Sequence, residues 1–449
     1  MGIYAMFKIT GKYSSFNYTY IMNKKLMMLA LGCIVLSVIQ SSCSSDSAES
    51  NNGQQSVTGG NVTAPIIDWP LNEAQLTEAQ PLNDFALRLT HQLWHNANGS
   101  IVASPLSMAV ALSMVIEGAE GETRDEVVKV LGFAPDRHSI LTDICASILH
   151  GLSVNNDSLR LEIANSCCVN RKYSLYREYS QIMRNYYDAD VSTMDFYNAE
   201  DVANLLNEWC KEHTKGMIPQ IISKDEIDES MVIFWLNAIY FKGLWSSPFP
   251  KGYTQNGAFQ RMDGSMTTTV LKPMMHLTNR MHYLRTDAFA AVELPYCGSR
   301  FVMTAVLPHN TDGFKTLLSD MTAIKVAEIK NLMKDEEVEL TLPRFSVESS
   351  FSDELKTALQ DMGVRRLFSS DRAQITNVSP DTDLYVSLTL HKARLEVNEE
   401  GTEAAAATLL GGKQTSSGNH TVFSANRPFL FYVTDRMTDL ILFTGIYNG

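Results

Sequence analysis

Histidine and cysteine side chains are the first candidates for chemistry in this chain. His91 and His95 are four residues apart, a spacing that places two imidazoles on one face of a helix. A zinc protease needs glutamate directly after the first histidine as its general base, and Gln92 takes that place. Cys167 and Cys168 are adjacent in a strand-like segment, where we expect small buried apolar side chains rather than a redox pair. The sequence therefore predicts neither a metal site nor a cofactor.

Motifs for nucleophilic catalysis and phosphate binding are also missing. The chain has no GxSxG turn to present a nucleophilic serine. Gly411, Gly412 and Lys413 lack the upstream glycine of a phosphate-binding loop. The 37 basic and 50 acidic residues give a net charge of −13 without a basic run, which argues against a nucleic-acid partner. We do not expect an enzyme. A hydrolytic enzyme ranks behind the two functions given at the end of this section.

The first 42 residues have the pattern of an export signal. Lys24 and Lys25 precede the apolar residues 26–39, a stretch of about 14 residues that is too short to span a bilayer comfortably. Small residues lead to Cys43, as in the cleavage box of bacterial lipoproteins, although Gln40 stands where leucine is usual. We therefore expect residues 1–21 to be either an extension ahead of the true start at Met22 or a leader. Residues 22–42 would be the signal peptide, and Cys43 would carry the lipid.

Residues 43–81 are expected to form a flexible polar tether. The Ser, Gly and Asn content of residues 44–60 leaves little apolar area to bury. A Ser/Asp-rich stretch directly after the cysteine also resembles surface-export signals of Gram-negative lipoproteins. This pattern predicts an outer-membrane lipoprotein held to the membrane by its lipid. A surface-exposed and a periplasmic position both stay open, as does an ordinary cleaved signal peptide.

The rest of the chain predicts an α+β fold, with helices early and strands late. Ser104 and Pro105 are a helix start, Thr123 to Glu126 is a capping box, and Gly132 and Gly363 are stops. Helical spacing of apolar residues marks 83–95, 202–209 and 355–362. Strands are expected at 231–241, 291–294, 301–307, 337–342, 384–388, 393–397, 429–433 and 440–443.

One segment conflicts with its own conformational preference. Four consecutive alanines, 404–407, favour a helix, yet they follow a strand pattern and precede a polar loop. As a strand, the segment places Thr402 and Thr408 on the same face as two of the alanines, and Glu403 on the other. A face this small could enter an existing sheet without clashing. The segment is therefore either a low-complexity linker or a loop able to become a strand.

At this point the chain resembles the serpins, the serine protease inhibitor superfamily, over roughly residues 82–449. The resemblance rests on seven stretches that occur in the family's order: Ser104-Pro105-Leu106-Ser107, Gly118-Ala119 with Gly121-Glu122-Thr123, Leu236 to Gly243 with Trp245 and Phe249, Glu293-Leu294-Pro295-Tyr296, His391-Lys392-Ala393, Glu396 to Thr402, and Asn426-Arg427-Pro428-Phe429.

The resemblance implies a single domain of three β-sheets and about nine helices, with an exposed, insertable reactive-centre loop at about residues 399–425. It also implies a monomer whose partner is a target protease. By the family pattern, a polar cluster lies under the central sheet, Trp245 marks the place where loop insertion begins, and a small-residue hinge leads into the loop. The cluster is Ser104, Ser107, Asn237 and His391. The hinge is Glu399, Glu400, Gly401, Thr402, Glu403, Ala404, Ala405, Ala406, Ala407 and Thr408.

The family pattern implies an inhibitor that traps a serine endopeptidase as a covalent acyl complex. Counting from Glu399 places the scissile bond between Thr415 and Ser416, which suits elastase-like proteases. Counting back from Pro428 places it near Ser417, and attack after Lys413 would suit trypsin-like proteases. The alternative function is a non-inhibitory binding lipoprotein on the same fold.

Overall fold

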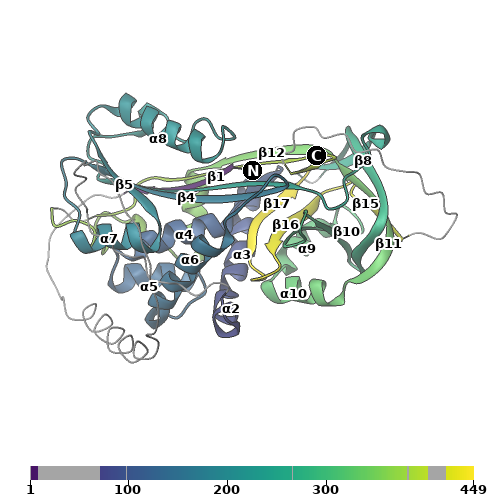
Figure 1. Cartoon of the computed structure of the whole chain (residues 1–449), viewed down its shortest axis with the longest axis horizontal. Coiled ribbons are helices and arrows are strands. Elements are labelled where there is room, and N and C mark those ends of the chain that lie inside the picture. The colour runs from purple at the N-terminus through teal and green to yellow at the C-terminus, as the bar shows by residue number, and fades with distance from the viewer. Residues whose placement is uncertain (1, 9–70, 98, 265, 382–383, 403–420) are drawn as a thin grey trace, which may run out of the picture.

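The computed structural model describes residues 2–8, 71–97, 99–264, 266–381, 384–402 and 421–449. Helices occupy mainly the first half of the chain and strands the second, as Figure 1 shows, which confirms the α+β class. The helices are α2 (Glu73–Ala79), α3 (Pro81–Ala97), α4 (Pro105–Ile116), α5 (Gly121–Val130), α6 (His138–Leu152), α7 (Arg177–Tyr186), α8 (Ala199–His213), α9 (Gly313–Asp320), α10 (Ala323–Leu332) and α11 (Asp353–Met362).

Two of the predicted helix boundaries show how local the capping signals are. Ser104 caps α4 as expected, because its Oγ accepts the backbone N–H of Ser107 at 3.2 Å. The predicted capping box at Thr123 is wrong, since α5 already begins at Gly121. Thr123 lies inside the helix, and its Oγ1 accepts the N–H of Gln374 at 2.9 Å. A distant loop therefore uses the hydroxyl that the local pattern had assigned to the cap.

The eight-stranded sheet runs along the molecule, and in hydrogen-bonded order its strands are β1, β13, β14, β6, β4 and β3, with β12 beside β13 and β5 beside β4. Their bounds are β1 (Gly2–Lys8), β3 (Val154–Asn155), β4 (Leu159–Asn170), β5 (Ala189–Met194), β6 (Ile233–Leu244), β12 (Phe345–Phe351), β13 (Thr389–Val397) and β14 (Gly401–Thr402). The predicted strand at 384–388 is wrong: β13 starts at Thr389. Leu384 and Val386 are buried, but the N–H of Val386 bonds to Leu367 O, outside the sheet.

The second sheet has nine strands, in the order β15, β11, β8, β9, β10, β16, β17 and β2, with β7 beside β8. Their bounds are β2 (Ile101–Ala103), β7 (Gln255–Asp263), β8 (Met266–Arg285), β9 (Phe289–Pro295), β10 (Phe301–Pro308), β11 (Lys334–Pro343), β15 (Thr421–Ser424), β16 (Phe429–Asp435) and β17 (Ile441–Tyr447). The described strands thus join into two sheets where three were expected. The reason is that β8 pairs with β7 and β11 and, at its end, with β9.

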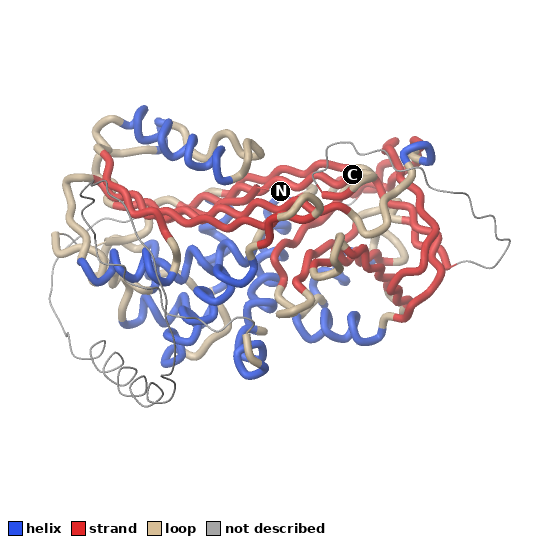
Figure 2. The backbone as a smooth tube through the Cα atoms, in the orientation of Figure 1, coloured by secondary structure: helices blue, strands red, loops and turns tan. Residues whose placement is uncertain are grey.

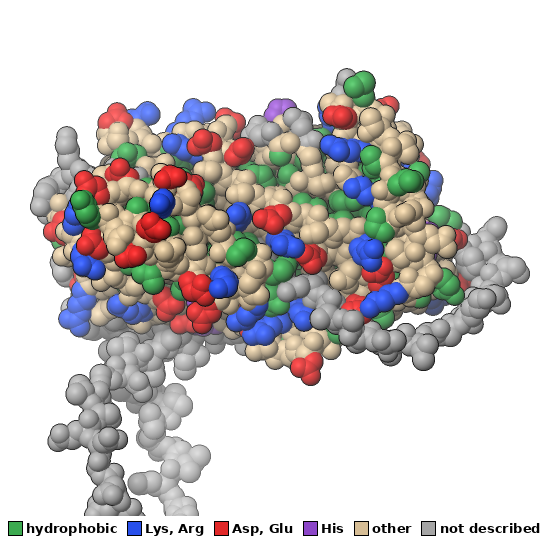
Figure 3. All heavy atoms as spheres, turned by 90° about the horizontal axis from the view of Figure 1, so that it is seen from above, with side chains coloured by type: hydrophobic (Ala, Val, Ile, Leu, Met, Phe, Trp, Pro, Cys, Tyr) green, Lys and Arg blue, Asp and Glu red, His purple; other side chains and the backbone are tan. Residues whose placement is uncertain are grey.

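The long sheet is covered on both faces. Helix α8 lies over one face, and helices α3 to α7 lie under the other, as Figure 2 shows. Trp235 and Phe241 of β6 belong to the main core, whereas Phe234 and Leu236 belong to a second core with residues of α8. Burial on both sides explains why β6 is a continuous apolar run rather than an alternating one. Acidic and basic side chains are interspersed on the face seen in Figure 3.

The ordered fold begins earlier than the sequence suggests. Residues 43–81 were expected to be a tether, yet α2 (Glu73–Ala79) lies within that range, with Asn72 and Gln75 forming a capping box. Residues 1–21 were expected to be an extension ahead of the true start or a leader, and Gly2–Lys8 forms strand β1 of the long sheet. Within the described ranges, every helix is too short or too polar to span a membrane.

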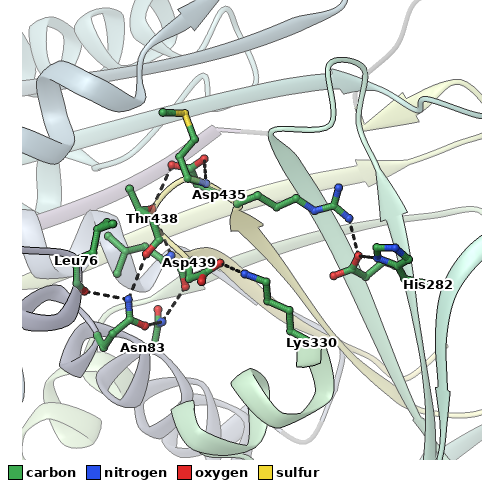
Figure 4. A network of polar contacts seen from close by, with 12 residues as sticks. Leu76, Asn83, His282, Lys330, Asp435, Thr438 and Asp439 are labelled. Atoms are coloured by element: carbon green, nitrogen blue, oxygen red, sulfur yellow. Dashed lines mark hydrogen bonds and ion pairs between the residues drawn. The ribbon is translucent and has the colours of Figure 1, made fainter. Parts of the chain in front are cut away.

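A polar network fixes the turn between β16 and β17 to the helices, as Figure 4 shows. Asp435, fully buried, accepts from Arg300 Nε at 2.9 Å and from Thr438 Oγ1 at 3.1 Å. Asn83 of α3 donates to Asp439 O at 2.9 Å and accepts the N–H of Ile441 at 2.8 Å. Buried contacts therefore hold the C-terminal hairpin in place, in addition to its covalent link to the preceding chain.

Candidate functional site

The functional residues gather where β14 enters the end of the long sheet. Gly401 pairs with Leu244, and Thr402 pairs with Gly243 on one side and Val397 on the other. A Cβ at position 401 would lie 2.1 Å from Gly243 O, so only glycine allows this close backbone approach. The start of the expected hinge is thus already a short central strand between β13 and β6.

Thr402 directs its side chain into the core. The side chain is fully buried, and Thr402 Oγ1 lies 2.7 Å from Tyr296 Oη. Burial raises the pKa of Tyr296 further above neutral, and either of the two hydroxyls can donate this hydrogen bond. Thr402 is therefore a small, buried side chain whose hydroxyl has a hydrogen-bond partner.

Trp245 holds the turn that leads into β14. Its indole Nε1 donates to Asn398 O at 3.0 Å, and its backbone N–H donates to Glu400 O at 2.8 Å. Its ring stacks on Tyr296, with centroids 4.5 Å apart and an angle of 18° between the planes. The aromatic residue expected at the insertion point therefore contacts the hinge directly and belongs to the core as well.

Two hinge glutamates are anchored beside this turn. Glu399 is 5% exposed, and its Oε1 accepts from Thr254 Oγ1 at 2.7 Å and from Arg344 Nη1 at 3.4 Å. Glu400 forms an ion pair with Lys251. These contacts fix the residues before Gly401, and strand pairing fixes Gly401 and Thr402.

The four predicted cluster residues do meet beneath the sheet. Ser104 donates its N–H to His391 Nε2 at 3.1 Å and its hydroxyl to Leu442 O at 2.7 Å. Ser107 Oγ donates to Asn237 Oδ1. All four residues are buried, and they join the start of α4 to β6 and β13, the strands on either side of β1.

Sequence reasoning missed several members of the site. Asn165 of β4 extends the polar cluster, because Asn237 Nδ2 donates to Asn165 Oδ1 at 2.6 Å. An asparagine inside an apolar strand was the signal that could have found it. Tyr296 stood within a quoted motif, but nothing local indicated its contact with Thr402. Thr254 and Arg344 carried no signal for their contact with Glu399.

Several predicted residues lie outside the described residues. They are the hinge positions Glu403, Ala404, Ala405, Ala406, Ala407 and Thr408, the scissile-bond candidates Lys413, Thr415, Ser416 and Ser417, and the lipidation candidate Cys43.

The other candidates for chemistry lie away from this site. Cys167 and Cys168 are free and buried, on the main and second core respectively. Burial raises the pKa of both thiols, that of Cys168 to about 12, which confirms their interpretation as apolar core residues. His91 and His95 lie on α3 with ring centroids 6.5 Å apart. No group of three metal-ligating residues occurs in the described part of the chain.

Comparison with known proteins decides the family. The sequence profile described as "Serpin (serine protease inhibitor)" matches residues 80–448. The chain belongs to the serpin family. The leukocyte elastase inhibitor of Xenopus tropicalis is 34% identical over 364 residues, covering 79% of this chain and 94% of that serpin. Iripin-3 of Ixodes ricinus is 33% identical over 373 residues, covering 82% and 93%.

Solved serpin structures share the fold. The native state of tengpin, a thermophilic serpin, has a TM-score of 0.74 at 25% identity and covers 84% of this chain and 95% of its own. Cleaved serpin 42Da has a TM-score of 0.74 at 28% identity, covering 84% and 99%. The chain is a protease inhibitor rather than an enzyme, and its partners are proteases.

Proposed function

We propose that this serpin traps a serine endopeptidase as a covalent acyl-enzyme and stabilises that complex by inserting its loop into the long sheet. The protease serine attacks the carbonyl carbon of Thr415 and the bond to Ser416 breaks. Ser416 takes up the proton and becomes the new N-terminus of a C-terminal fragment whose strands β15, β16 and β17 stay paired in the second sheet. Insertion of the loop then carries the tethered protease away before water reaches the ester. The observation that supports this proposal is the hinge, Gly401 and Thr402, already paired between β13 and β6.

The strand register indicates how far insertion extends. Counting on from Thr402, which pairs with Gly243 and Val397, residue 405 would lie opposite Tyr240 and Arg394, and residue 410 opposite Trp235 and Thr389. Position 412 would face Ile233, where β6 begins. The inserted strand would thus end three residues before Thr415, which places the ester just beyond the sheet.

Insertion releases enough free energy to act on a partner. About a dozen new ladder hydrogen bonds at ~1 kcal/mol each compare with the ~5–15 kcal/mol that stabilises a whole domain. The alanines of the hinge leave room for the strand, and Gly401 allows the close approach that β14 needs.

The target class and the location complete the proposal. Thr415 has a small side chain suited to elastase-like proteases, and one relative is named a leukocyte elastase inhibitor. Trypsin-like attack after Lys413 is the second option. We propose a monomer attached to the outer membrane through Cys43 and facing host or competitor proteases. A surface-exposed position suits that role better than a periplasmic one.

A binding lipoprotein without inhibitory activity is the alternative. The thyroxine-binding globulin complex with thyroxine shares the fold at a TM-score of 0.73 and 24% identity. The small residues of this hinge favour inhibition over such a carrier role.

One gel separates the two functions. The chain starting at Ser44 is incubated with elastase-like and trypsin-like serine proteases, and the products are separated in SDS. With at least one class of protease, we expect a band at the mass of the protease plus the chain without its released C-terminal peptide. Cleavage by every protease without such a band would exclude trapping. The N-terminal sequence of the released peptide identifies the scissile bond.

A further inference from the structure

The strand between β13 and β6 is made by the N-terminus of the chain. Gly2 pairs with Arg394 and Tyr240, and Phe7 pairs with Thr389 and Trp235. In Figure 1, β1 lies in the long sheet, far in sequence from both neighbours. Among the described strands, β13 and β6 do not pair with each other. The sheet therefore has one open strand position, and Gly2–Lys8 fills it.

The same position is the one that the reactive loop needs. Counting on from the pairs of Gly401 and Thr402 places residue 405 opposite Arg394 and Tyr240, which are the partners of Gly2. Residue 411 falls opposite Phe234, the partner of Lys8. β1 also runs in the same direction as β14, antiparallel to both neighbours. If the loop inserts in this register, residues 405–411 would need the backbone hydrogen bonds that residues 2–8 make in this structure.

We propose that Gly2–Lys8 is an intramolecular ligand of the long sheet, and that it blocks loop insertion for as long as it remains part of the chain. The inference rests on the proposed function, because only an inserting loop can be blocked. One strand position admits one strand, so occupation by β1 leaves the loop only the two residues of β14.

The two segments differ in strand preference. Gly2–Lys8 reads Gly-Ile-Tyr-Ala-Met-Phe-Lys, and residues 405–411 read Ala-Ala-Ala-Thr-Leu-Leu-Gly. Ile, Tyr and Phe favour strands, whereas Ala and Gly are depleted from them. The N-terminal segment is therefore the stronger competitor before loop cleavage, when insertion of the loop is also restrained at both of its ends.

We call the occupation of the strand position between β13 and β6 by Gly2–Lys8 the lock. Removal of the N-terminal segment would release it. A chain that starts at Met22, or is cut before Cys43, lacks Gly2–Lys8. Processing at the expected signal would therefore convert a locked precursor into an inhibitor with a free strand position. The activity would appear only after Gly2–Lys8 has been removed.

Three chains made in a cell-free system test the lock: the full chain, the full chain with Ala5→Pro, and the chain starting at Ser44. Ala5 pairs with both His391 and Asn237, and proline there removes a ladder N–H while keeping the length of the leader. We expect amide hydrogen exchange in β6 and β13 to be at least about tenfold slower in the full chain than in the other two. Equal exchange in all three would overturn the proposal.

A second readout separates this proposal from the proposed function. With an elastase-like protease, the full chain should give at least about tenfold less SDS-stable complex than either control. Synthetic Gly2–Lys8 peptide should suppress the complex formed by the Ser44 chain, and a peptide with proline at position 5 should not. If no chain forms a complex, covalent trapping fails, and hydrogen exchange still decides the lock. If all chains form complex equally, the lock is wrong and trapping stands.

Discussion

Thr402 Oγ1 lies 2.7 Å from Tyr296 Oη, and both side chains are fully buried. This contact joins the first inward position of the hinge to the ring that stacks on Trp245. The side chain of Thr402 therefore occupies a buried site in which it makes one hydrogen bond. A larger or charged side chain at position 402 has no space and no partner there.

We expect Thr402→Arg to convert the inhibitor into a substrate. The guanidinium would have to enter a fully buried site beside Tyr296 without a counter-ion, which costs several kcal/mol. Complex yield on SDS gels should fall at least tenfold while cleavage of the loop continues. Glu403→Arg is the matched control, because position 403 belongs to the opposite face by strand alternation. An unchanged yield for Thr402→Arg would refute the hinge assignment.

The polar cluster should resist opening of the sheet. Asn237→Ala leaves the Ser107 hydroxyl and the Asn165 amide without a shared buried partner, at a cost of about 2–4 kcal/mol. Thermal unfolding should shift to lower temperature, and the inhibitory fraction should decline faster on storage as sheets open spontaneously. Asn256→Ala, at an exposed position of β7, should change neither. Equal unfolding temperatures and equal inhibitory fractions for the two variants would show that the polar cluster does not resist opening of the sheet.

The C-terminal hairpin should depend on its buried ion pair. Asp435→Asn removes the charge that faces Arg300, whose side chain is 19% exposed, and should lower the free energy of unfolding by about 3 kcal/mol. The exposed pair Arg280 and Asp335 provides the control, since Asp335→Asn should cost less than about 1 kcal/mol. Urea titrations of both variants measure the difference. Similar losses of unfolding free energy would show that the buried pair of Asp435 and Arg300 stabilises the protein no more than the exposed pair does.

Glu117 should make stability depend on pH. Burial raises the pKa of this carboxyl above its ordinary value of 4.5, against the hydrogen bond from Thr142. The folded state then binds more protons than the unfolded state, so the contribution of Glu117 to stability decreases as pH rises from about 4.5 to the raised pKa. Glu117→Gln should therefore stabilise the protein at neutral pH and have no such effect below about pH 4.5. Denaturation at several pH values measures this, and a pH-independent difference would contradict it.

Cys43 should decide membrane attachment. Cys43→Ser removes the proposed lipidation site and should move the protein from the membrane to the soluble fraction of its host cells. Ser44→Ala, one residue further on, should leave the protein on the membrane. Fractionation followed by immunoblotting compares the two. Membrane association of the Cys43→Ser protein would exclude the proposed cleavage site.

The parts of the fold that sequence could predict are those encoded locally. Ser104 followed by Pro105 predicts the start of α4 because the cap and its acceptor lie three residues apart. Gly363 predicts the end of α11 because its φ of 120° suits glycine. The hinge and the polar cluster were assigned by family resemblance, since Asn237 and His391 carry no local signal that brings them together.

The parts that could not be predicted depend on pairing between distant residues. Tyr296 meets Thr402 across 106 residues, and Gly2 meets Arg394 across nearly the whole chain. The sequence predicted that Thr123 caps a helix, but its hydroxyl accepts a hydrogen bond from the backbone N–H of Gln374 instead. In each case the partner is chosen by the packing of sheets and loops. No window of neighbouring residues contains that information.

Covalent trapping is tested most directly by the intact mass of the SDS-stable product formed by the Ser44 chain and an elastase-like protease. We predict one species whose mass equals the protease plus residues 44–415, less one water for the ester bond, together with a free peptide that begins at Ser416. Intact protease beside a cleaved chain, with no joined species for any serine protease tried, would contradict the proposed mechanism.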